Sequence, residues 1–182
     1  MKLKLNNVRL AFPVLFEAKT VNGEGKPAFS ASFLMDPADP QVKALNQAIE
    51  QVAKDKWGAK ADAILKQMRA QDKVALHDGD LKSNYDGFPG NLYVSARSTT
   101  RPLVIDKDKS PLTEQDGKPY TGCYVNASVE LWAQDNNYGK RINASLRGVQ
   151  FFKDGDAFAG GGAASEDEFD DIAEGATADD LV

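Results

Sequence analysis

The chain has 182 residues, of which 42% are apolar and 27% charged, and its formal net charge is −5; this suits one folded domain with an appendage and excludes global disorder. It contains no run of 18 apolar residues and begins without the apolar stretch of a signal peptide, so we expect no membrane association and a cytoplasmic location. Its single cysteine (Cys123) and single histidine (His77) exclude an internal disulfide framework and a Cys/His zinc site, and we expect no cofactor.

Two segments near the N-terminus alternate between apolar and polar residues, which predicts strands over residues 3–12 and 28–35. The alternation changes phase at Asn6-Asn7, as it does at a β-bulge. The stretch between them, residues 17–27, is rich in turn-forming residues and predicts a loop. Four phenylalanines at core-facing positions are predicted to be buried. Three lie in these two strands, Phe12, Phe29 and Phe33, and the fourth is Phe151 in a later strand.

A helical block follows the second strand. Asp39-Pro40 predicts a helix start, and apolar residues then recur at helical spacing over residues 41–57 and 60–70. Because the block lies between strands, we predict a helical insertion over about residues 38–70 rather than a separate domain. Trp57 ends the first helix on its apolar face and is predicted to pack against the core.

The rest of the body predicts β-structure. Residues 78–91 contain several glycines and a proline and predict a loop, and two short strands follow over residues 92–98 and 102–106. Long alternating segments over residues 122–135 and 141–152 predict a β-hairpin. Five or six strands with one helical insertion fit a small, partly open barrel, so we predict a mainly β, OB-like fold.

The charges divide the chain into two parts. Residues 1–153 contain all 22 basic and 17 of the 27 acidic residues, whereas residues 154–182 contain ten acidic residues and no basic one. We therefore predict a domain of net charge +5 over residues 1–153 and a flexible acidic tail over residues 154–182. Acidic residues around isolated apolar ones suit docking on a partner, and a purely solubilising tail is the alternative. The predicted partner-binding residues are Phe169, Ile172, Asp179, Asp180, Leu181 and Val182.

The outward positions of the hairpin combine aromatic rings with cations. Single-stranded nucleic acid needs both, because bases stack on rings while cations neutralise the backbone. Loop and short-strand residues extend this surface, although such aromatics also commonly cover a core. The predicted DNA-binding residues are Lys82, Tyr85, Phe88, Tyr93, Arg97, Arg101, Tyr124, Trp132, Lys140, Arg141 and Arg147.

Signals for catalysis are weak. His77 with Asp78 and Asp80 would suit a metal ion or a general base, which leaves a metal-dependent nuclease as one alternative. The sequence has no GxxxxGK[ST] phosphate-binding loop, and Cys123 falls on an inward strand position. We predict that the chain is not an enzyme, and a scaffold module that works through its tail is the second alternative.

Several segments, taken in order, resemble a family of phage-encoded single-stranded DNA-binding proteins with an OB fold. They are NVRLAFPVLFEAK (7–19), AFSASFLMDP (28–37), HDGD (77–80), GFPGNLYVSARS (87–98), RPLVID (101–106) and the long stretch 120–158. The resemblance implies binding of single-stranded DNA without marked sequence preference, in phage replication or recombination. It also implies an acidic tail that contacts replication proteins and competes with DNA.

The tail departs from that family in one respect. Many such tails end in phenylalanine, whereas this chain ends in Leu181-Val182 and its last phenylalanine is Phe169. The apolar residues available for docking on a partner are therefore Phe169, Ile172, Leu181 and Val182, and the prediction also allows a homodimer.

Overall fold

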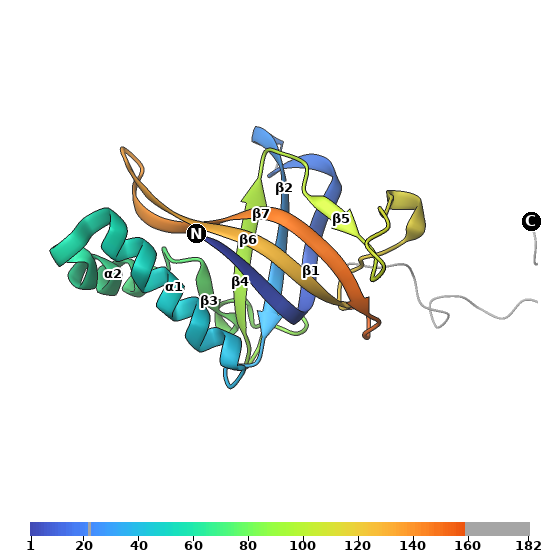
Figure 1. Ribbon diagram of the computed structural model, residues 1–182, viewed down its shortest axis with the longest axis horizontal. Coiled ribbons are helices and arrows are strands. Elements are labelled where there is room, and N and C mark those ends of the chain that lie inside the picture. Colours follow the sequence, from blue (N-terminus) through green and yellow to red (C-terminus); the bar gives the residue numbers. More distant parts are fainter. Residues whose placement is uncertain (22, 159–182) are drawn as a thin grey trace, which may run out of the picture.

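The computed structural model describes residues 1–21 and 23–158. Its strands are β1 (Lys2–Val21), β2 (Glu24–Met35), β3 (Leu76–Asp78), β4 (Leu92–Ser98), β5 (Leu103–Ile105), β6 (Tyr124–Asn136) and β7 (Gly139–Lys153), and its longer helices are α1 (Pro40–Trp57) and α2 (Ala61–Ala70). The strands form one sheet in the order β3-β4-β2-β1-β6-β7-β5 (Figure 1). Within the described ranges, no helix is long and apolar enough to cross a membrane.

Five of the strands close into a barrel. β1, β2 and β4 pair as an antiparallel meander, and β6 and β7 form a hairpin whose first arm pairs with β1. A short parallel pairing, Ala96 with Ala144 and Arg97 with Ser145, joins β4 to β7 and completes the ring. This connectivity confirms the predicted mainly β, OB-like fold, with the difference that the barrel is closed rather than partly open.

The first hairpin is longer than the sequence pattern predicts. Residues 17–27 were predicted as a loop, but most of them extend β1 and β2, with Lys19 opposite Ala28 and Val21 opposite Glu24. The predicted bulge at Asn6-Asn7 is confirmed. Leu5 pairs with Ala127 and Val8 with Val125, so β1 advances by three residues where β6 advances by two.

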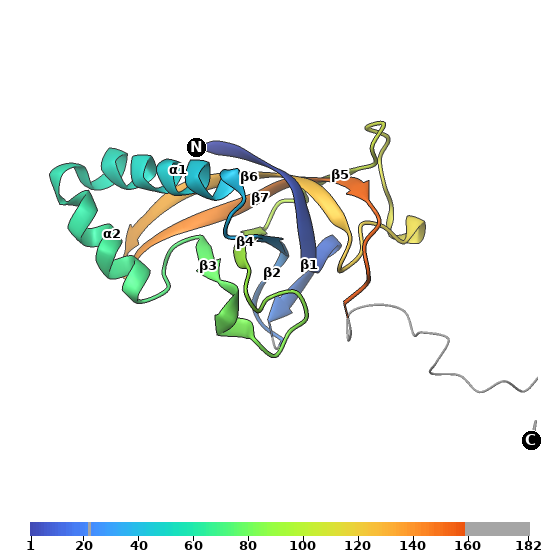
Figure 2. The same cartoon turned by 90° about the horizontal axis from the view of Figure 1, so that it is seen from below.

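The core lies inside the barrel and is closed at one end by α1. The inward positions of β6 and β7 are buried as their alternation predicts. Asp39 caps α1 by accepting a hydrogen bond from the Gln41 amide at 2.9 Å, and the apolar face of the helix packs beside the β6–β7 hairpin (Figure 2). The core residues contributed by α1 are Leu45, Ala48, Ile49, Val52 and Ala53.

Trp57 connects α1 to the hairpin. Its ring is partly buried against the core, and its indole N–H donates to Asp135 Oδ2 at 3.0 Å. That hydrogen bond holds the pKa of Asp135 below its usual range. The end of the helix thereby fixes the outer part of the hairpin.

A second, smaller cluster covers the outside of the barrel where β1, β2 and β4 run side by side. It contains Ala11, Leu34, Phe88 and Tyr93, and residues 79–91 fold back over it. The prediction that Phe12 is a core residue is wrong, because its side chain is 45% exposed on this outer face. A register shift between Ala11 and Val14 changes the alternation at this point, and Phe12 itself has φ +50°.

The first residues of the predicted tail pack against the barrel. Tyr120 Oη donates to Asp154 at 2.6 Å, and Arg9 Nη2 donates to the Asp156 carbonyl at 2.7 Å. The Phe158 ring lies under the Arg9 guanidinium, 4.3 Å from it, and joins the second cluster. A Cβ on Gly87 would come within 2.4 Å of this ring, so the close approach requires glycine there. The remaining tail residues lie outside the described part of the chain.

We expect residues 154–158 to stabilise the domain. A chain truncated after Lys153 should have a free energy of unfolding lower by about 2 kcal/mol than one truncated after Phe158, because it loses a packed aromatic ring and the hydrogen bonds of this segment. Urea unfolding of both chains measures the difference, and equal midpoints would contradict a stabilising role.

Candidate nucleic-acid interface

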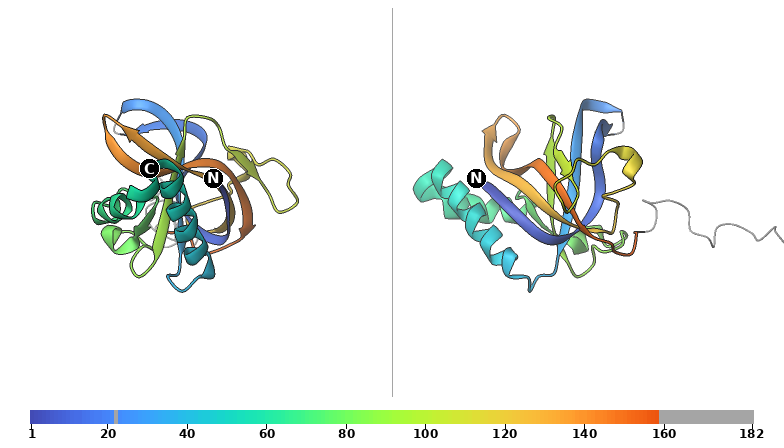
Figure 3. Two further views of the ribbon diagram at one scale, coloured as in Figure 1. Left: turned by 60° about the vertical axis from the view of Figure 1, so that its left-hand side comes forward. Right: turned by 45° about the vertical axis from the view of Figure 1, so that its right-hand side comes forward.

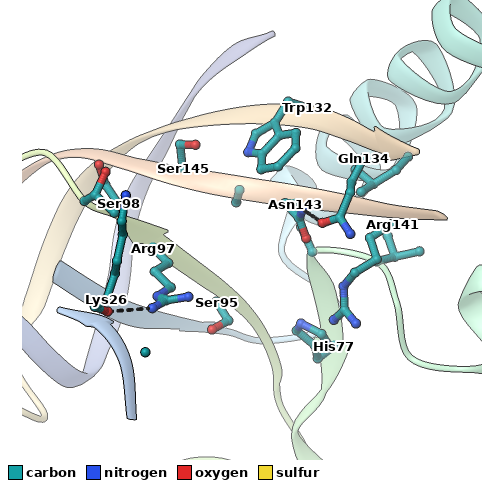
Figure 4. Close-up of a pocket in the computed structure, with 16 residues that line it drawn as sticks. Lys26, His77, Ser95, Arg97, Ser98, Trp132, Gln134, Arg141, Asn143 and Ser145 are labelled. Atoms are coloured by element: carbon teal, nitrogen blue, oxygen red, sulfur yellow. Dashed lines mark hydrogen bonds between the residues drawn. The ribbon is translucent and has the colours of Figure 1, made fainter. Parts of the chain in front are cut away.

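A groove of about 830 Å³ crosses the outside of the barrel between the β1–β2 and β6–β7 hairpins. The two hairpins stand on either side of β4 in Figure 3, and Figure 4 shows the side chains that line the space. We call it the hairpin groove; the side chains labelled in Figure 4 are Lys26, His77, Ser95, Arg97, Ser98, Trp132, Gln134, Arg141, Asn143 and Ser145.

The closure of the barrel determines where these side chains meet. β4 and β7 pair through only two residue pairs, and beyond them the hairpin continues to its turn at Asn137-Tyr138. Ser95 and Arg97 occupy alternate positions on β4 and therefore face the same side. The parallel pairing sets Arg97 opposite Ser145, so the polar row of β4 continues onto β7.

On the hairpin, two cross-strand pairs line the groove in addition to Ser145. Trp132 lies opposite Asn143, and Gln134 lies opposite Arg141. Asn143 Nδ2 donates to Gln134 Oε1 at 2.9 Å, which fixes both amides beside the ring (Figure 4). Trp132 is 44% exposed, so its indole is accessible to a ligand in the groove.

The groove is positively charged. Lys26, Arg97 and Arg141 line it, and among the described residues its lining contains no Asp or Glu. Arg97 Nη2 donates to the Lys26 carbonyl at 3.3 Å, and the Arg141 guanidinium extends across the groove toward His77 (Figure 4). A carboxylate does lie next to the lining, since Asp72 Oδ1 is 2.6 Å from His77 Nδ1.

Of the eleven predicted DNA-binding residues, all of which the structure describes, three meet in this groove: Arg97, Trp132 and Arg141. Tyr124 shares a strand face with Trp132 but lies eight residues away, about 27 Å along β6. Its ring instead contacts Arg9 and Lys153 at the far end of the barrel.

Three other predicted cations have contacts within the domain. Arg147 donates to Glu130 at 3.0 Å, and Arg101 donates to the Phe16 carbonyl at 2.9 Å. Lys140 lies 3.8 Å from Asp135, near the hairpin turn. All three are outside the groove lining.

Four other predicted residues, Lys82, Tyr85, Phe88 and Tyr93, form a separate group outside the groove lining. Phe88 is fully buried and Tyr93 is 4% exposed, so the prediction that these two rings stack on DNA bases needs correction: they are core residues of the second cluster. Burial also raises the pKa of Tyr93. Tyr85 is 45% exposed, and Lys82 Nζ lies 5.3 Å from the Tyr93 ring centre.

Several groove residues were not among the predicted DNA contacts. Lys26 belongs to a segment predicted as a loop, so strand alternation could not predict the face on which its side chain lies. Asn143 and Ser145 were predicted to point outward from the hairpin, and that alternation was the signal that could have identified them. His77 reaches the groove only because β3 pairs with β4.

The alternative of a metal enzyme finds little support around His77. Asp78 accepts a hydrogen bond from the Asp80 amide and Asp80 accepts one from Gly90, so both carboxylates hold the loop together. In the described ranges, no group of three His, Cys, Asp or Glu residues is arranged to hold a metal ion. Burial raises the pKa of Cys123 to about 11, which leaves its thiol protonated at neutral pH.

The chain is similar to known phage proteins in sequence. A family model described as "Enterobacter phage Enc34, ssDNA-binding protein" matches residues 1–182. Protein p50 of Acyrthosiphon pisum secondary endosymbiont phage 1 is 53% identical over 175 residues, which are 94% of this chain and 94% of that protein.

Solved structures agree with these matches. The single-stranded DNA-binding protein from bacteriophage Enc34 in complex with ssDNA has a TM-score of 0.73 and 29% identity, covering 86% of this chain and 88% of that one. The gp2.5 single-stranded DNA-binding protein of bacteriophage T7 shares the fold, with a TM-score of 0.57 and 13% identity over 92% and 93% of the two chains. With a family model matched over its whole length and a relative more than half identical, the chain belongs to the Enc34 ssDNA-binding protein family.

Proposed function

We propose that the chain binds single-stranded DNA in the hairpin groove, without marked sequence preference and without catalysis. One observation carries the proposal: an exposed tryptophan and three cations line a groove that crosses β4 between two hairpins. OB folds bind oligonucleotides on the face formed by their second and third strands, and at the loops that join their first strand to the second and their fourth to the fifth. Here those strands are β2 and β4. The solved Enc34 relative in complex with ssDNA supports the same ligand.

The chemistry of the groove suits a flexible, charged strand. A base stacks on the Trp132 indole, while Lys26, Arg97 and Arg141 neutralise phosphates. Every base has a π-face, so stacking tolerates any sequence. Asn143 already donates to Gln134, so part of the hydrogen-bonding capacity of these amides is used within the hairpin rather than for reading bases.

The acidic tail regulates and extends this activity in the proposal. Residues 159–182 contain eight Asp and Glu residues, which compete with DNA phosphates for the cations of the groove. When DNA displaces the tail, its apolar residues become available to replication or recombination proteins of the phage in the host cytoplasm. The predicted docking residues Phe169, Ile172, Asp179, Asp180, Leu181 and Val182 lie outside the described part of the chain. A homodimer also stays a prediction.

Trp132→Ala tests the stacking role. The variant should bind labelled oligo-dT more weakly by about 1–3 kcal/mol in fluorescence anisotropy, because a base loses its ring partner. Phe152→Ala is the matched control, since Phe152 is 40% exposed but lies outside the groove lining. If the folded Trp132 variant binds as tightly as the control, Trp132 is not in the DNA site.

The salt dependence of binding tests the cations. Three phosphate contacts should give a slope of log affinity against log salt of about −2, and Arg141→Gln should reduce its magnitude by about 0.7. Measurements in the presence of duplex competitor separate single-stranded DNA binding from general polyanion binding. A slope unchanged by Arg141→Gln would remove this residue from the interface, and no affinity at all would favour the scaffold alternative.

Deletion of residues 159–182 tests the competition. At low salt the shortened chain, 1–158, should bind oligo-dT more tightly than the full chain, because eight carboxylates no longer compete for the groove. The difference should shrink as salt screens the charges. Equal affinities at low salt would show that the tail does not occupy the groove.

A further inference from the structure

The backbone at Phe12 is unusual and turns an aromatic ring outward. Phe12 has φ +50°, a conformation that bulky side chains rarely adopt because the Cβ crowds the backbone. It lies in the register shift between Ala11 and Val14, and its ring is 45% exposed. A strained position that exposes a large apolar ring contributes little to the core, and such positions gather at functional sites.

A second exposed ring lies against it from a distant part of the sequence. Tyr85, in the loop between β3 and β4, meets Phe12 edge to face with 5.0 Å between ring centres and is also 45% exposed. Lys82 Nζ lies 5.7 Å from the Phe12 ring centre. Phe88 fills the space behind the pair and is fully buried, so the two outer rings are not needed to complete the cluster.

The loop holds this arrangement through its own hydrogen bonds. The carboxylates of Asp78 and Asp80 accept from backbone amides, and Asn91 Nδ2 donates to the Gly87 carbonyl at 2.7 Å. Gly79 packs so closely on the backbone of Phe88 that a Cβ there would clash. Because the loop is fixed by these contacts, the two rings are positioned before any ligand arrives.

A series of contacting rings connects the hairpin groove to the exposed pair Phe12 and Tyr85. His77 lines the groove and stacks on Tyr93 with 4.9 Å between ring centres. Tyr93 meets Phe88 at 5.0 Å, and Phe88 meets Phe12 at 5.7 Å. Arg97 and Tyr93 lie four residues apart on one strand face, about 13 Å. The exposed pair therefore adjoins one end of the groove on the same outer surface.

We propose that Phe12, Tyr85 and Lys82 form a second base-stacking subsite, the aromatic shelf, which receives nucleotides that extend beyond the groove. The inference rests on the proposed function, because the strand reaches the shelf only from the groove. Its rings offer the π-surface that any base accepts, and Lys82 offers a cation for the adjoining phosphate. Phe158, the last described residue, packs against the same cluster, and the acidic residues 159–182 that follow it in the sequence are the competing occupant in this proposal.

The test compares oligo-dT of two lengths, about 5 and about 15 nucleotides, within the range of site sizes of OB folds. Phe12→Leu and Tyr85→Leu in the full chain remove each ring but keep an apolar side chain, and Phe152→Leu is the control. We expect the longer strand to bind about fivefold or more weakly to either shelf variant, and the short strand to bind equally to all. Trp132→Ala should weaken both lengths.

The results distinguish failure of the shelf from failure of the proposed function. If the wild-type chain binds neither strand, the proposed function and the shelf both fail. If Trp132→Ala weakens binding but neither shelf variant does at either length, the shelf alone is overturned. It is also overturned if the shelf variants weaken only the binding of a peptide of residues 159–182 to the 1–158 chain.

Photocrosslinking gives a second readout that does not depend on the stability of the variants. A long oligo-dT carrying halogenated uracil should crosslink to Phe12 or Tyr85 of the wild-type chain, and the short one should not. Phe12→Asn serves as a further variant, because asparagine tolerates positive φ and removes the ring without added backbone strain. Crosslinks confined to the hairpin groove at both lengths would contradict the shelf.

Discussion

The short parallel pairing between β4 and β7 is the contact on which the proposed site depends. Its two residue pairs, Ala96 with Ala144 and Arg97 with Ser145, close the barrel. They also bring the outward-facing side chains of β4 beside those of the β6–β7 hairpin. Without this closure Trp132 and Arg97 would belong to separate surfaces, and neither a ring nor a cation alone binds a nucleic-acid strand well. The hydrogen bond from Trp57 to Asp135 fixes the outer part of the hairpin, which carries Trp132 and Arg141, and therefore also supports the site.

The charge of the groove is consistent with the proposed binding of DNA without marked sequence preference. The lining described here places three cations in a space with no carboxylate of its own, and in the proposed binding mode phosphates neutralise them without any base being read. In the same proposal these cations also attract other polyanions, including the eight carboxylates of residues 159–182. Both proposed interactions are electrostatic, so we expect salt to weaken both.

The sequence predicts the regular elements of the fold well, because they follow from local patterns. The alternation of the β6–β7 hairpin and the cap at Asp39 both appear where they are expected. The predicted site is less accurate, because residues that share one face of a strand do not all lie in the same binding site. Tyr124 and Trp132 share one face of β6 but lie at opposite ends of the barrel. Phe12 and Phe88 exchange their predicted environments, since a register shift and a folded-back loop depend on contacts distant in sequence.

Hydrogen–deuterium exchange of the full chain, with and without oligo-dT, tests the location of the DNA site most directly. The account predicts slower amide exchange on DNA binding in β4 and across residues 132–145, which border the hairpin groove. We expect no change in β5, which pairs with residues 148–150 of β7 and contributes no residue to the groove lining. Protection confined to β5 and the neighbouring face of β7, with the groove unchanged, would contradict it.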